Sequence, residues 1–314
     1  MNPVSAIAHT NIALIKYWGK AQQQNNLPAT GSLSLTLDAF YTKTTLSLAE
    51  SDSLILDGQA ESGERFYRVA QFLGHLRLLS GKSFKCAVAS ENHVPTSAGL
   101  ASSASGFAAL ALAGAKFFGL DLDGKALSEL ARIGSGSAAR SIFPGLARMH
   151  TAGYAEPVLD APLDLCLVVV SCSRKQKAID SREAMNLTAQ TSPYYPAWVS
   201  THQADLDGAL AAIQAGDFDA LGRLVEHSTL KMHASLMAAQ PGLWYFEPLS
   251  LTVMAAVHSL RQQGLPAYFT LDAGPHVKVL CEQKNAEALQ RELSNIVGVS
   301  GVTLAGPGPG AYLL

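Results

Sequence analysis

Apolar residues recur at steps of three and four along several parts of the chain, a spacing that places them on one face of a helix. The clearest example is 63–79, where the apolar positions are Phe66, Val69, Phe72, Leu73, Leu76 and Leu79. Gly81 ends this pattern. Further helices are predicted over 105–118, 127–133, 137–143, 195–215, 218–239, 248–263 and 285–297. The first of these is rich in Ala and Leu, which are strong helix formers.

Continuous or alternating apolar residues predict strands between these helices. We expect one or two strands within 32–48, around residues 38–40, and single strands over 84–89 and 163–170. A strand–turn–strand follows at 267–280, and a last strand precedes Gly306. Because strands and helices are mixed in both halves of the chain, the pattern favours the α+β class over a doubly wound sheet.

A loop-like stretch around Pro157 and Pro162 divides this pattern in two. The chain has 314 residues, which at roughly 150 residues per domain favours two domains. We place the boundary near Ala161, with one domain over 1–160 and the other over 161–314.

Composition and charge then narrow the class of protein. Apolar residues make up 48 % of the chain and charged residues 15 %, which excludes a disordered chain. The net charge is −2 without a basic tail, so we expect no nucleic-acid partner. Apolar runs such as 107–113 are far shorter than the roughly 18 residues of a membrane span, so we expect no membrane partner. Residues 1–20 lack a signal-peptide core, and the four cysteines show no zinc spacing, which predicts a cytoplasmic protein with reduced thiols.

One segment rich in Gly and Ser, 95–103 (PTSAGLASS), lies between a predicted strand and the Ala-rich helix. Free N–H groups and the helix dipole make such a helix start a phosphate site, and the hydroxyls of Ser102 and Ser103 could bind phosphate or Mg²⁺. An ordinary capped loop is the alternative. It is not a Walker loop, because Leu76 stands where the first Gly of the Gly81-Lys82-Ser83 match would be required.

Two further stretches concentrate glycine. Residues 134–141 (GSGSAARS) imitate a dinucleotide fingerprint but follow a helix-like segment, which disfavours that class. Arg140 could bind a carboxylate or phosphate with both guanidinium arms, or could be a surface residue in a helix–helix turn. Residues 306–310 (GPGPG) are interpreted as a turn, with no chemical role assigned.

Asp272 and Lys16 are candidate acid–base groups. Asp272 ends an apolar strand and enters the turn 273–275 (AGP), where it could act as a base or orienting group, although ordinary turn chemistry is the alternative. Lys16 lies in an apolar run, and a buried lysine needs a carboxylate partner, for which Asp272 is a candidate. Lys20, after Gly19, could face an anionic ligand or simply be solvated. The nine histidines form no H-E-x-x-H motif, and no G-x-S-x-G elbow is present.

Taken together, these segments resemble the GHMP kinase superfamily and, within it, the mevalonate diphosphate decarboxylases. The matching stretches occur in the family's order: 11–20 (NIALIKYWGK), 95–105 (PTSAGLASSAS), 131–141 (ARIGSGSAARS), 232–234 (MHA) and 268–279 (YFTLDAGPHVKV). The serine-rich loop alone would indicate only the superfamily. The IKYWGK, GSGSAxRS and DAGP segments together are specific to the decarboxylase branch.

The resemblance implies ATP-dependent decarboxylation of mevalonate 5-diphosphate to isopentenyl diphosphate, with ATP and Mg²⁺ as cofactors. The implied fold is α+β and GHMP-kinase-like. It has a ribosomal-S5-like N-terminal half and a ferredoxin-like C-terminal half, with the active site in the cleft between them. A homodimer is the family expectation.

The resemblance also implies roles for individual residues, which lie in the matching segments except for Ser181 and Arg182, two residues that precede Met185. The catalytic residues would be Asp272, Arg140 and Lys16. The substrate would be held by Tyr17, Lys20, Ser135, Gly136, Ser137, Arg140, Ser181 and Arg182. The ATP loop would comprise Pro95, Ser97, Ala98, Gly99, Leu100, Ala101, Ser102, Ser103 and Ala104, with Ser102 and Ser103 near the metal.

The chain departs from the family pattern at two places, which leaves the substrate's phosphate number open. Thr30-Gly31-Ser32 stands where the family commonly has Asn-Ser-Ser or Asn-Asn-Ser, and His276 follows the DAGP turn where Asn is usual. The alternatives are a related enzyme of the 5-phosphate and a 3-kinase that does not decarboxylate. A non-catalytic nucleotide-binding protein is disfavoured, because Asp272, Arg140 and Lys16 are all present.

Overall fold

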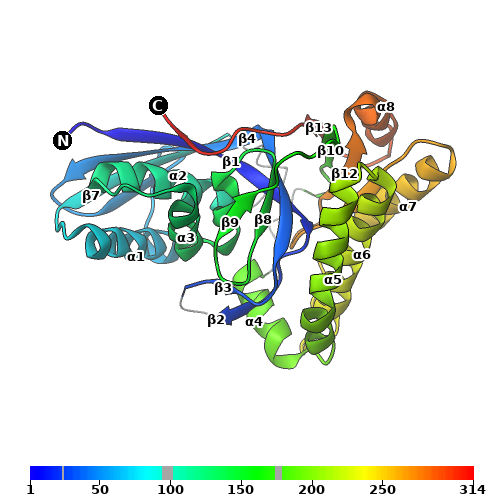
Figure 1. Cartoon of the computed structure of the whole chain (residues 1–314), viewed down its shortest axis with the longest axis horizontal. Helices are drawn as coiled ribbons and strands as arrows, with labels where there is room; N and C mark the ends of the chain where they lie inside the picture. The colour runs from blue at the N-terminus through cyan, green and yellow to red at the C-terminus, as the bar shows by residue number, and fades with distance from the viewer. Residues whose placement is uncertain (23–24, 94–101, 174–178) are drawn as a thin grey trace.

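A computed structural model describes residues 1–22, 25–93, 102–173 and 179–314 of the chain. Strands and helices alternate through the described residues, and they separate into an N-terminal and a C-terminal half (Figure 1). The α+β class predicted from the sequence is confirmed.

The N-terminal half is organised around a mixed sheet. Its described part has eight strands in the order β14-β1-β4-β7-β5-β6, with β8 and β9 continuing from β4. The strand bounds are β1 Val4–Ile15, β4 Ser32–Ala49, β5 Ser53–Leu56, β6 Gln59–Ala60, β7 Lys85–His93, β8 Leu146–Met149, β9 Ala155–Pro157 and β14 Tyr312–Leu313. A separate hairpin is formed by β2 (Lys20–Gln22) and β3 (Leu27–Pro28).

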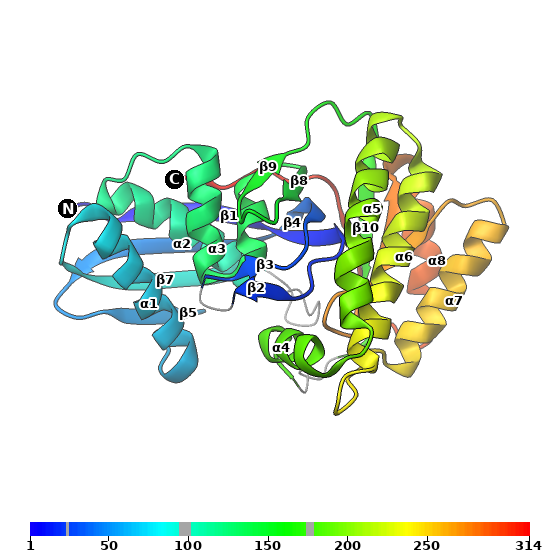
Figure 2. The ribbon, with the colours of Figure 1, turned by 60° about the horizontal axis from the view of Figure 1, so that its bottom comes forward.

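Three helices and one 3₁₀ helix accompany this sheet. They are α1 (Gly63–Ser80), α2 (Ser102–Phe118), α3 (Gly124–Gly134) and η1 (Gly136–Ile142). The Ala-rich α2 packs directly on β1 and β4, as Figure 2 shows from below. Apolar side chains of α1, α2 and α3 bury one face of the sheet and form one core cluster.

The C-terminal half contains a four-stranded antiparallel sheet within the described residues, in the order β11-β12-β10-β13. Its strands are β10 (Leu165–Val170), β11 (Tyr268–Thr270), β12 (Val277–Glu282) and β13 (Val302–Ala305). The helices are α4 (Ser181–Thr191), α5 (Tyr195–Gln214), α6 (Phe218–Met237), α7 (Pro248–Gln262) and α8 (Gln283–Ser294). Helices follow the first and third strands, which is the β-α-β-β-α-β order of a ferredoxin-like unit.

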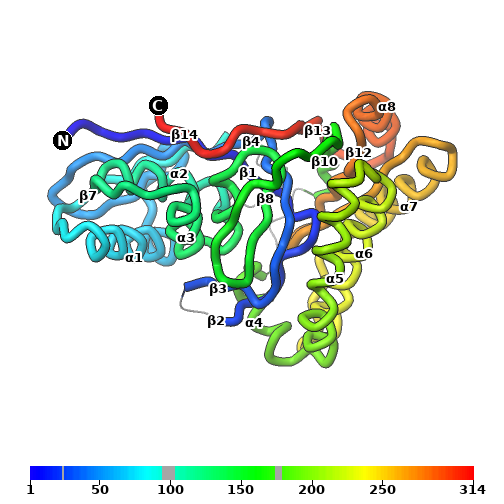
Figure 3. Tube along the Cα trace, in the orientation of Figure 1, coloured from blue at the N-terminus to red at the C-terminus, as the bar shows by residue number. Residues whose placement is uncertain are grey.

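The two halves are joined by a shared core and by the end of the chain. One apolar cluster combines Leu14 and Leu35 of the N-terminal half with Leu167, Leu206 and Leu221 of the C-terminal half. After β13 the chain returns across the molecule, and β14 pairs with β1 beside the N-terminus (Figure 3). The N-terminal sheet is therefore completed by the last residues of the chain.

The long periodic helices agree with the sequence prediction, and the shorter elements differ. Residues 32–49 form one continuous strand where one or two were expected, and its pairing with β1 shifts register between His9 and Asn11. Strand β1 begins at Val4 and ends at Ile15, so that Lys16 directly follows its last residue. Helix α4 and strand β14 were not predicted. Among the described residues, no helix has the length and apolar character needed to cross a membrane.

Candidate active site

The segment after β1 and the turn after β11 meet at an ion-pair triad, formed by Lys16, Asp272 and Lys278. The Lys16 Nζ lies 2.6 Å from Asp272 Oδ1, and the Lys278 Nζ lies 3.3 Å from Asp272 Oδ2. Both lysines are almost fully buried, whereas the Asp272 side chain is 37 % exposed. The carboxylate is thus the accessible member of the triad, and the lysine partner predicted for it is present.

Burial and charge oppose each other in this triad. Burial raises the pKa of Asp272, but the positive charges of Lys16 and Lys278 outweigh burial and hold that pKa well below its usual range. Burial lowers the pKa of Lys16 to about 8, despite the favourable charge of Asp272. Asp272 is therefore an anion at neutral pH, with both of its oxygens facing ammonium groups.

The turn that carries Asp272 is held from two helices. Ser250 of α7 donates a hydrogen bond to the Pro275 carbonyl at 2.6 Å. His233 of α6 contacts the Leu271 carbonyl through Nε2 at 3.4 Å, and burial lowers the pKa of His233 to about 3. A neutral His233 can donate this hydrogen bond, so the MHA segment contacts the residue that precedes Asp272.

Arg140 lies on η1, and its guanidinium is buried where the two strands β1 and β4 run side by side. One terminal nitrogen donates to Ser32 Oγ at 2.7 Å, and Nε donates to Asn11 Oδ1 at 3.3 Å. Burial lowers its pKa to about 10, although the neighbouring groups Tyr17 and Asp272 raise it. Arg140 is fully charged at neutral pH and close enough to Asp272 for their charges to interact.

The Tyr17 hydroxyl lies in the same region and is buried without a hydrogen-bond partner among the described residues. Burial raises its pKa to about 12. The guanidinium carbon of Arg140 lies 5.7 Å from the centre of the Tyr17 ring. Because a Cβ at Gly136 would lie 2.1 Å from the Tyr17 oxygen, glycine is required there for the tyrosine to occupy this position. An unpaired buried hydroxyl is available to a ligand.

A second group of cations, Lys20, Arg68 and Arg182, is linked to Tyr17 through Arg182, whose charge acts on the Tyr17 hydroxyl. Burial lowers the pKa of Lys20, the charges of Arg182 and Arg68 lower it as well, and the charge of Asp180 raises it; together they bring this pKa to about 8. Arg68 of α1 donates to the Gly134 carbonyl at 3.0 Å, and its Nε has no partner within the described residues. Lys20, Arg68 and Arg182 therefore lie near enough for their positive charges to interact, with the carboxylates of Asp180 and Glu64 beside them. A group of cations of this kind suits an anion of more than one charge.

The other substrate residues named from the sequence lie on the same elements. Ser135 and Ser137 are within 3.3 Å of each other through their hydroxyls, and the Ser137 carbonyl accepts from Asn11 Nδ2 at 2.9 Å. Ser181 begins α4, where Asp180 caps the helix by accepting from the Arg182 N–H at 2.8 Å. Asn11 therefore links η1 to β1 on the side where Arg140 is bound.

The predicted nucleotide loop falls mostly outside the described residues. These are Pro95, Ser97, Ala98, Gly99, Leu100 and Ala101, and the side chain of Ser102 is outside the description as well. Ser102 and Ser103 form the start of α2, whose first turn has no acidic residue, and Ala104 is buried. A helix start without acidic side chains suits a phosphate group.

Both departures from the family pattern have a structural explanation. His276 is buried, and its Nδ1 accepts from the Cys172 N–H at 3.2 Å, an interaction that an amide oxygen could also make. A Cβ at Gly31 would lie 2.6 Å from a Leu206 methyl group, so a larger residue requires another packing there. The Gly31 carbonyl is held instead by His202 of α5 at 2.9 Å. Ser32, which follows, keeps its contact with Arg140.

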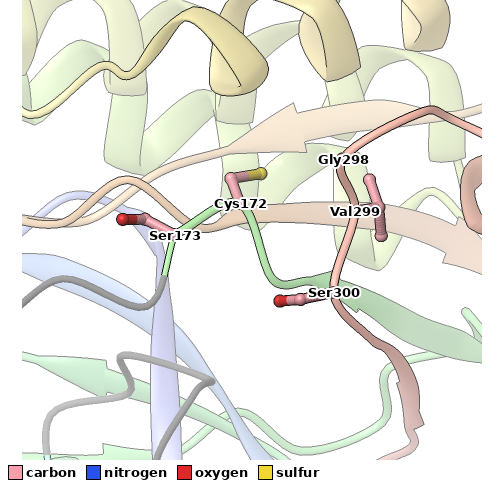
Figure 4. Close-up of a pocket in the computed structure, with 5 residues that line it drawn as sticks. All are labelled: Cys172, Ser173, Gly298, Val299 and Ser300. Carbon is pink, nitrogen blue, oxygen red and sulfur yellow. The ribbon is translucent and has the colours of Figure 1, made fainter.

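A cavity of about 370 Å³ lies at the end of β10 and is lined by Cys172, Ser173, Gly298, Val299 and Ser300 (Figure 4). Among the described residues, none of the site residues predicted from the sequence lines this cavity.

Within the described part of the chain, no three His, Cys, Asp or Glu side chains group as a metal site. Mg²⁺ usually keeps several waters and binds substrate phosphates rather than a cage of protein ligands. The hydroxyls of Ser102 and Ser103 alone would therefore suit Mg²⁺ that is carried by a nucleotide.

Sequence reasoning missed Lys278 and Arg68. Lys278 lies inside the apolar strand VKVL, and so carried the same signal that identified Lys16: a lysine among apolar residues needs a partner. Arg68 is one polar position on an amphipathic helix, and nothing in the sequence distinguishes it from a solvated residue. Asn11 and Ser32, which hold Arg140, were also not assigned this role.

The ferredoxin-like half, the β1–β4–α2 layer and the site between them define a fold of the GHMP kinase type. Two family models match: the diphosphomevalonate decarboxylase-like N-terminal domain over residues 8–156, and the mevalonate 5-diphosphate decarboxylase C-terminal domain over residues 166–303. The chain belongs to the diphosphomevalonate decarboxylase family.

Individual relatives agree along the full length. A diphosphomevalonate decarboxylase of Candida albicans is 33 % identical, and the match covers 98 % of each chain. A solved structure described as MDDEF in complex with MVAPP, AMPPCP and magnesium is 43 % identical, with a TM-score of 0.94 over 99 % of this chain and 98 % of that one. Mevalonate diphosphate decarboxylase of Staphylococcus aureus is 38 % identical, with a TM-score of 0.95 over the same shares.

Proposed function

We propose that this chain catalyses the ATP-dependent decarboxylation of mevalonate 5-diphosphate to isopentenyl diphosphate, releasing ADP, phosphate and CO₂. The observation that carries the proposal is the pairing of an accessible carboxylate, Asp272, with a surrounding excess of cations in a member of this family. The substrate carries a carboxylate, a diphosphate and a tertiary hydroxyl. Binding these anionic groups close together requires their repulsion to be neutralised.

The cations divide between the two anionic ends of the substrate. We assign Arg140, which is fixed by Ser32 and Asn11, to the substrate carboxylate. We assign Lys20, Arg68 and Arg182 to the diphosphate, with the Tyr17 hydroxyl as a further donor. We propose that the same site is lined by four further substrate-binding residues, Ser135, Gly136, Ser137 and Ser181.

Asp272 is assigned to the 3-hydroxyl. Because Lys16 and Lys278 keep the carboxylate ionised and weakly basic, its principal role is to accept the hydroxyl proton's hydrogen bond and orient the oxygen. Positioning of this kind is the main protein contribution to phosphoryl transfer. ATP with Mg²⁺ supplies the phosphoryl group that turns the hydroxyl into a leaving group. As phosphate departs with the electron pair of the C3–O bond, positive charge develops at C3. The bond to the carboxylate held by Arg140 then breaks, its electron pair forms the new double bond, and CO₂ is released.

The test is product analysis by mass spectrometry, with purified protein, ATP, Mg²⁺ and, separately, mevalonate, its 5-phosphate and its 5-diphosphate. The proposal expects isopentenyl diphosphate and equal amounts of ADP and CO₂ from the 5-diphosphate. ADP without CO₂ would identify a 3-kinase instead. Turnover confined to the 5-phosphate would move the substrate assignment to the monophosphate.

The variant Asp272→Asn tests the role of the carboxylate. We expect kcat to fall about 10²- to 10⁴-fold, while the affinity for ATP measured by calorimetry stays within about twofold. Near-normal turnover would show that Asp272 has no part in the chemistry.

We also propose a cytoplasmic location, which the four buried free cysteines support.

A further inference from the structure

The glycine–proline segment between β13 and β14 contacts the two elements that carry Arg140 and its acceptor. We call residues 306–311 the C-terminal strap. In Figure 3 the red end of the chain leaves the C-terminal sheet at β13 and runs back over the N-terminal half to β14. Its alternating sequence, Gly-Pro-Gly-Pro-Gly-Ala, had no role in the analysis of the sequence alone.

Gly308 is the centre of this contact. Its N–H donates to the Thr36 carbonyl of β4 at 2.8 Å, and its carbonyl accepts from the Gly145 N–H at 3.0 Å. Thr36 lies four residues after Ser32 on the same strand, and Gly145 lies shortly after the end of η1. Gly308 therefore connects the strand of Ser32 to the segment that follows Arg140.

Other bonds of the strap support the same junction. The Ala311 N–H donates to the Ile142 carbonyl at the end of η1 at 3.2 Å. The Gly306 N–H donates to Asp38 Oδ1 at 2.9 Å, and the Gly306 carbonyl accepts from the Asp38 N–H at 3.0 Å. The strap thus forms hydrogen bonds with β4 at two residues and with the η1 end at two more.

The composition of the strap follows from these contacts. A Cβ at Gly308 would lie 2.4 to 2.6 Å from the backbone of Leu37 and Asp38, and one at Gly310 would lie 2.5 Å from the Ile142 carbonyl oxygen. Backbone atoms cannot give way as a side-chain tip can. Pro307 and Pro309 face solvent and restrict the chain between the glycines. The segment is therefore a stiff strip that lies backbone to backbone against the N-terminal half.

We propose that the C-terminal strap is a positioning element for Arg140, with Gly308 as its central positioning residue. The strap begins in the sheet that leads to Asp272 and ends in the sheet that carries Ser32, the acceptor of Arg140. The strap therefore fixes the position of the Arg140 guanidinium, in the N-terminal half, relative to the Asp272 carboxylate, in the C-terminal half. The inference rests on the proposed function, because it assigns Arg140 to the substrate carboxylate.

The test compares Gly308→Ala with Gly301→Ala, an exposed glycine where an added Cβ meets nothing within 4 Å. We expect Gly308→Ala to lower kcat/KM for mevalonate 5-diphosphate about 10- to 100-fold, since small displacements of a substrate-positioning group have effects of this size. KM for ATP should change less than about twofold. Gly301→Ala should match the wild type. Equal kinetics for the two variants would overturn the proposal.

A second readout separates this proposal from the proposed function. Hydrogen exchange of the peptide 140–146 should be faster in Gly308→Ala than in Gly301→Ala, because the Gly145 N–H loses its acceptor. If the wild type lacks decarboxylase activity, the proposed function is wrong, and the exchange rates still decide whether the strap orders the Arg140 segment. Unchanged exchange in that peptide would overturn the proposal whatever the activity.

A chain ending at Gly310 provides the variant to use if Gly308→Ala does not fold. It removes the Ala311–Ile142 hydrogen bond and the β14 pairing without introducing a clash. We expect a raised KM for mevalonate 5-diphosphate and faster exchange of 140–146, both relative to Gly301→Ala. Wild-type values of both would contradict the strap's role.

Discussion

Asp272 is placed between two ammonium groups, and this arrangement decides how it can act. A carboxylate whose oxygens face Lys16 and Lys278 stays ionised to low pH and binds a proton only weakly. It is consequently better suited to orient a hydroxyl group than to remove its proton in the free enzyme. The two lysines differ in origin, since one follows β1 and the other belongs to β12.

Lys278→Met tests the contribution of the second lysine. Loss of a nearby cation raises the pKa of Asp272, so the variant should lose activity on acidification at a pH where the wild type is still fully active. The measurement is the profile of kcat/KM against pH, from neutral pH down to the limit of stability. Lys284→Met is the control, because this exposed lysine pairs with Glu282 away from the site. Superimposable profiles for Lys278→Met and the wild type would contradict the effect of Lys278 on the pKa of Asp272.

Lys20 provides a prediction on the alkaline side. Its pKa in the folded protein is lowered to about 8, so it is protonated below that pH and loses its charge above it. If Lys20 binds the diphosphate, the dissociation constant of mevalonate 5-diphosphate should rise above about pH 8. Lys20→Arg should move this rise to higher pH, since arginine stays protonated. Calorimetric titrations at several pH values measure the effect, with the exposed Lys116→Arg as control. An unchanged rise in Lys20→Arg would mean that another group titrates.

The residues found from the sequence were those that chemistry makes conspicuous. Lys16 is a charge in an apolar run, and Asp272 ends a strand at a rigid turn, so each was assignable without coordinates. Their contact joins residues 256 positions apart, and the sequence supported it only through the need of a buried lysine for a carboxylate and through the resemblance to a family. Arg68 is distinguished from other arginines by its burial and by the charges beside it, of which Arg182 and Asp180 belong to a distant part of the chain. Such a role follows from tertiary structure alone.

At the scale of elements, strongly periodic segments were predicted well and weakly apolar ones were not. Helix α1 was predicted over 63–79 and spans Gly63–Ser80, because its apolar stripe is regular. Helix α4 was missed, since Ala184 and Thr188 are its buried residues and neither is strongly apolar. Strand β14 has two residues and is defined by its pairing with β1. Pairing between distant segments leaves no local pattern.

The packing of α6 against β11 leads to a stability prediction. A Cβ at Gly222 of α6 would lie 2.0 to 2.3 Å from ring atoms of Tyr268, a buried side chain whose hydroxyl donates to Asp219. Gly222→Ala should lower the free energy of unfolding by about 1–3 kcal/mol through overpacking. Gly74→Ala, at an open position of α1, should raise it by about 0.5–1 kcal/mol. Urea unfolding measures both. Equal stability of the two variants would show that Tyr268 moves aside at no cost.

At the scale of the whole molecule, some predictions from the sequence remain open. The boundary near Ala161 and the homodimer are still predictions, the second of which light scattering would test. The roles of the nucleotide-loop residues are likewise predictions. The fold class and the family were predicted correctly, because motifs spread from residue 11 to residue 279 constrain the chain as a whole.

The shared core predicts that the two halves unfold together. Leu14, Leu33 and Leu35 of the N-terminal half pack in one cluster with Leu167 and Leu206 of the C-terminal half. Separation of the halves would expose this apolar surface, which is unfavourable by about 25 cal/mol per Å². His202 and Trp198 of α5 add hydrogen bonds to the Gly31 and Trp18 carbonyls across the same boundary.

We therefore expect one cooperative transition in urea, with tryptophan fluorescence and circular dichroism giving the same midpoint. A polypeptide of residues 1–160 should not fold alone, because it lacks both the partner side chains of this core and strand β14. Its amide exchange should be that of an unfolded chain, whereas the full chain protects the β1 and β4 amides. Two separate transitions, or a folded 1–160 fragment, would show that each half has a sufficient core of its own. In that case Lys16 and Asp272, at the junction of the halves, would be held together by their ion pair rather than by a common core.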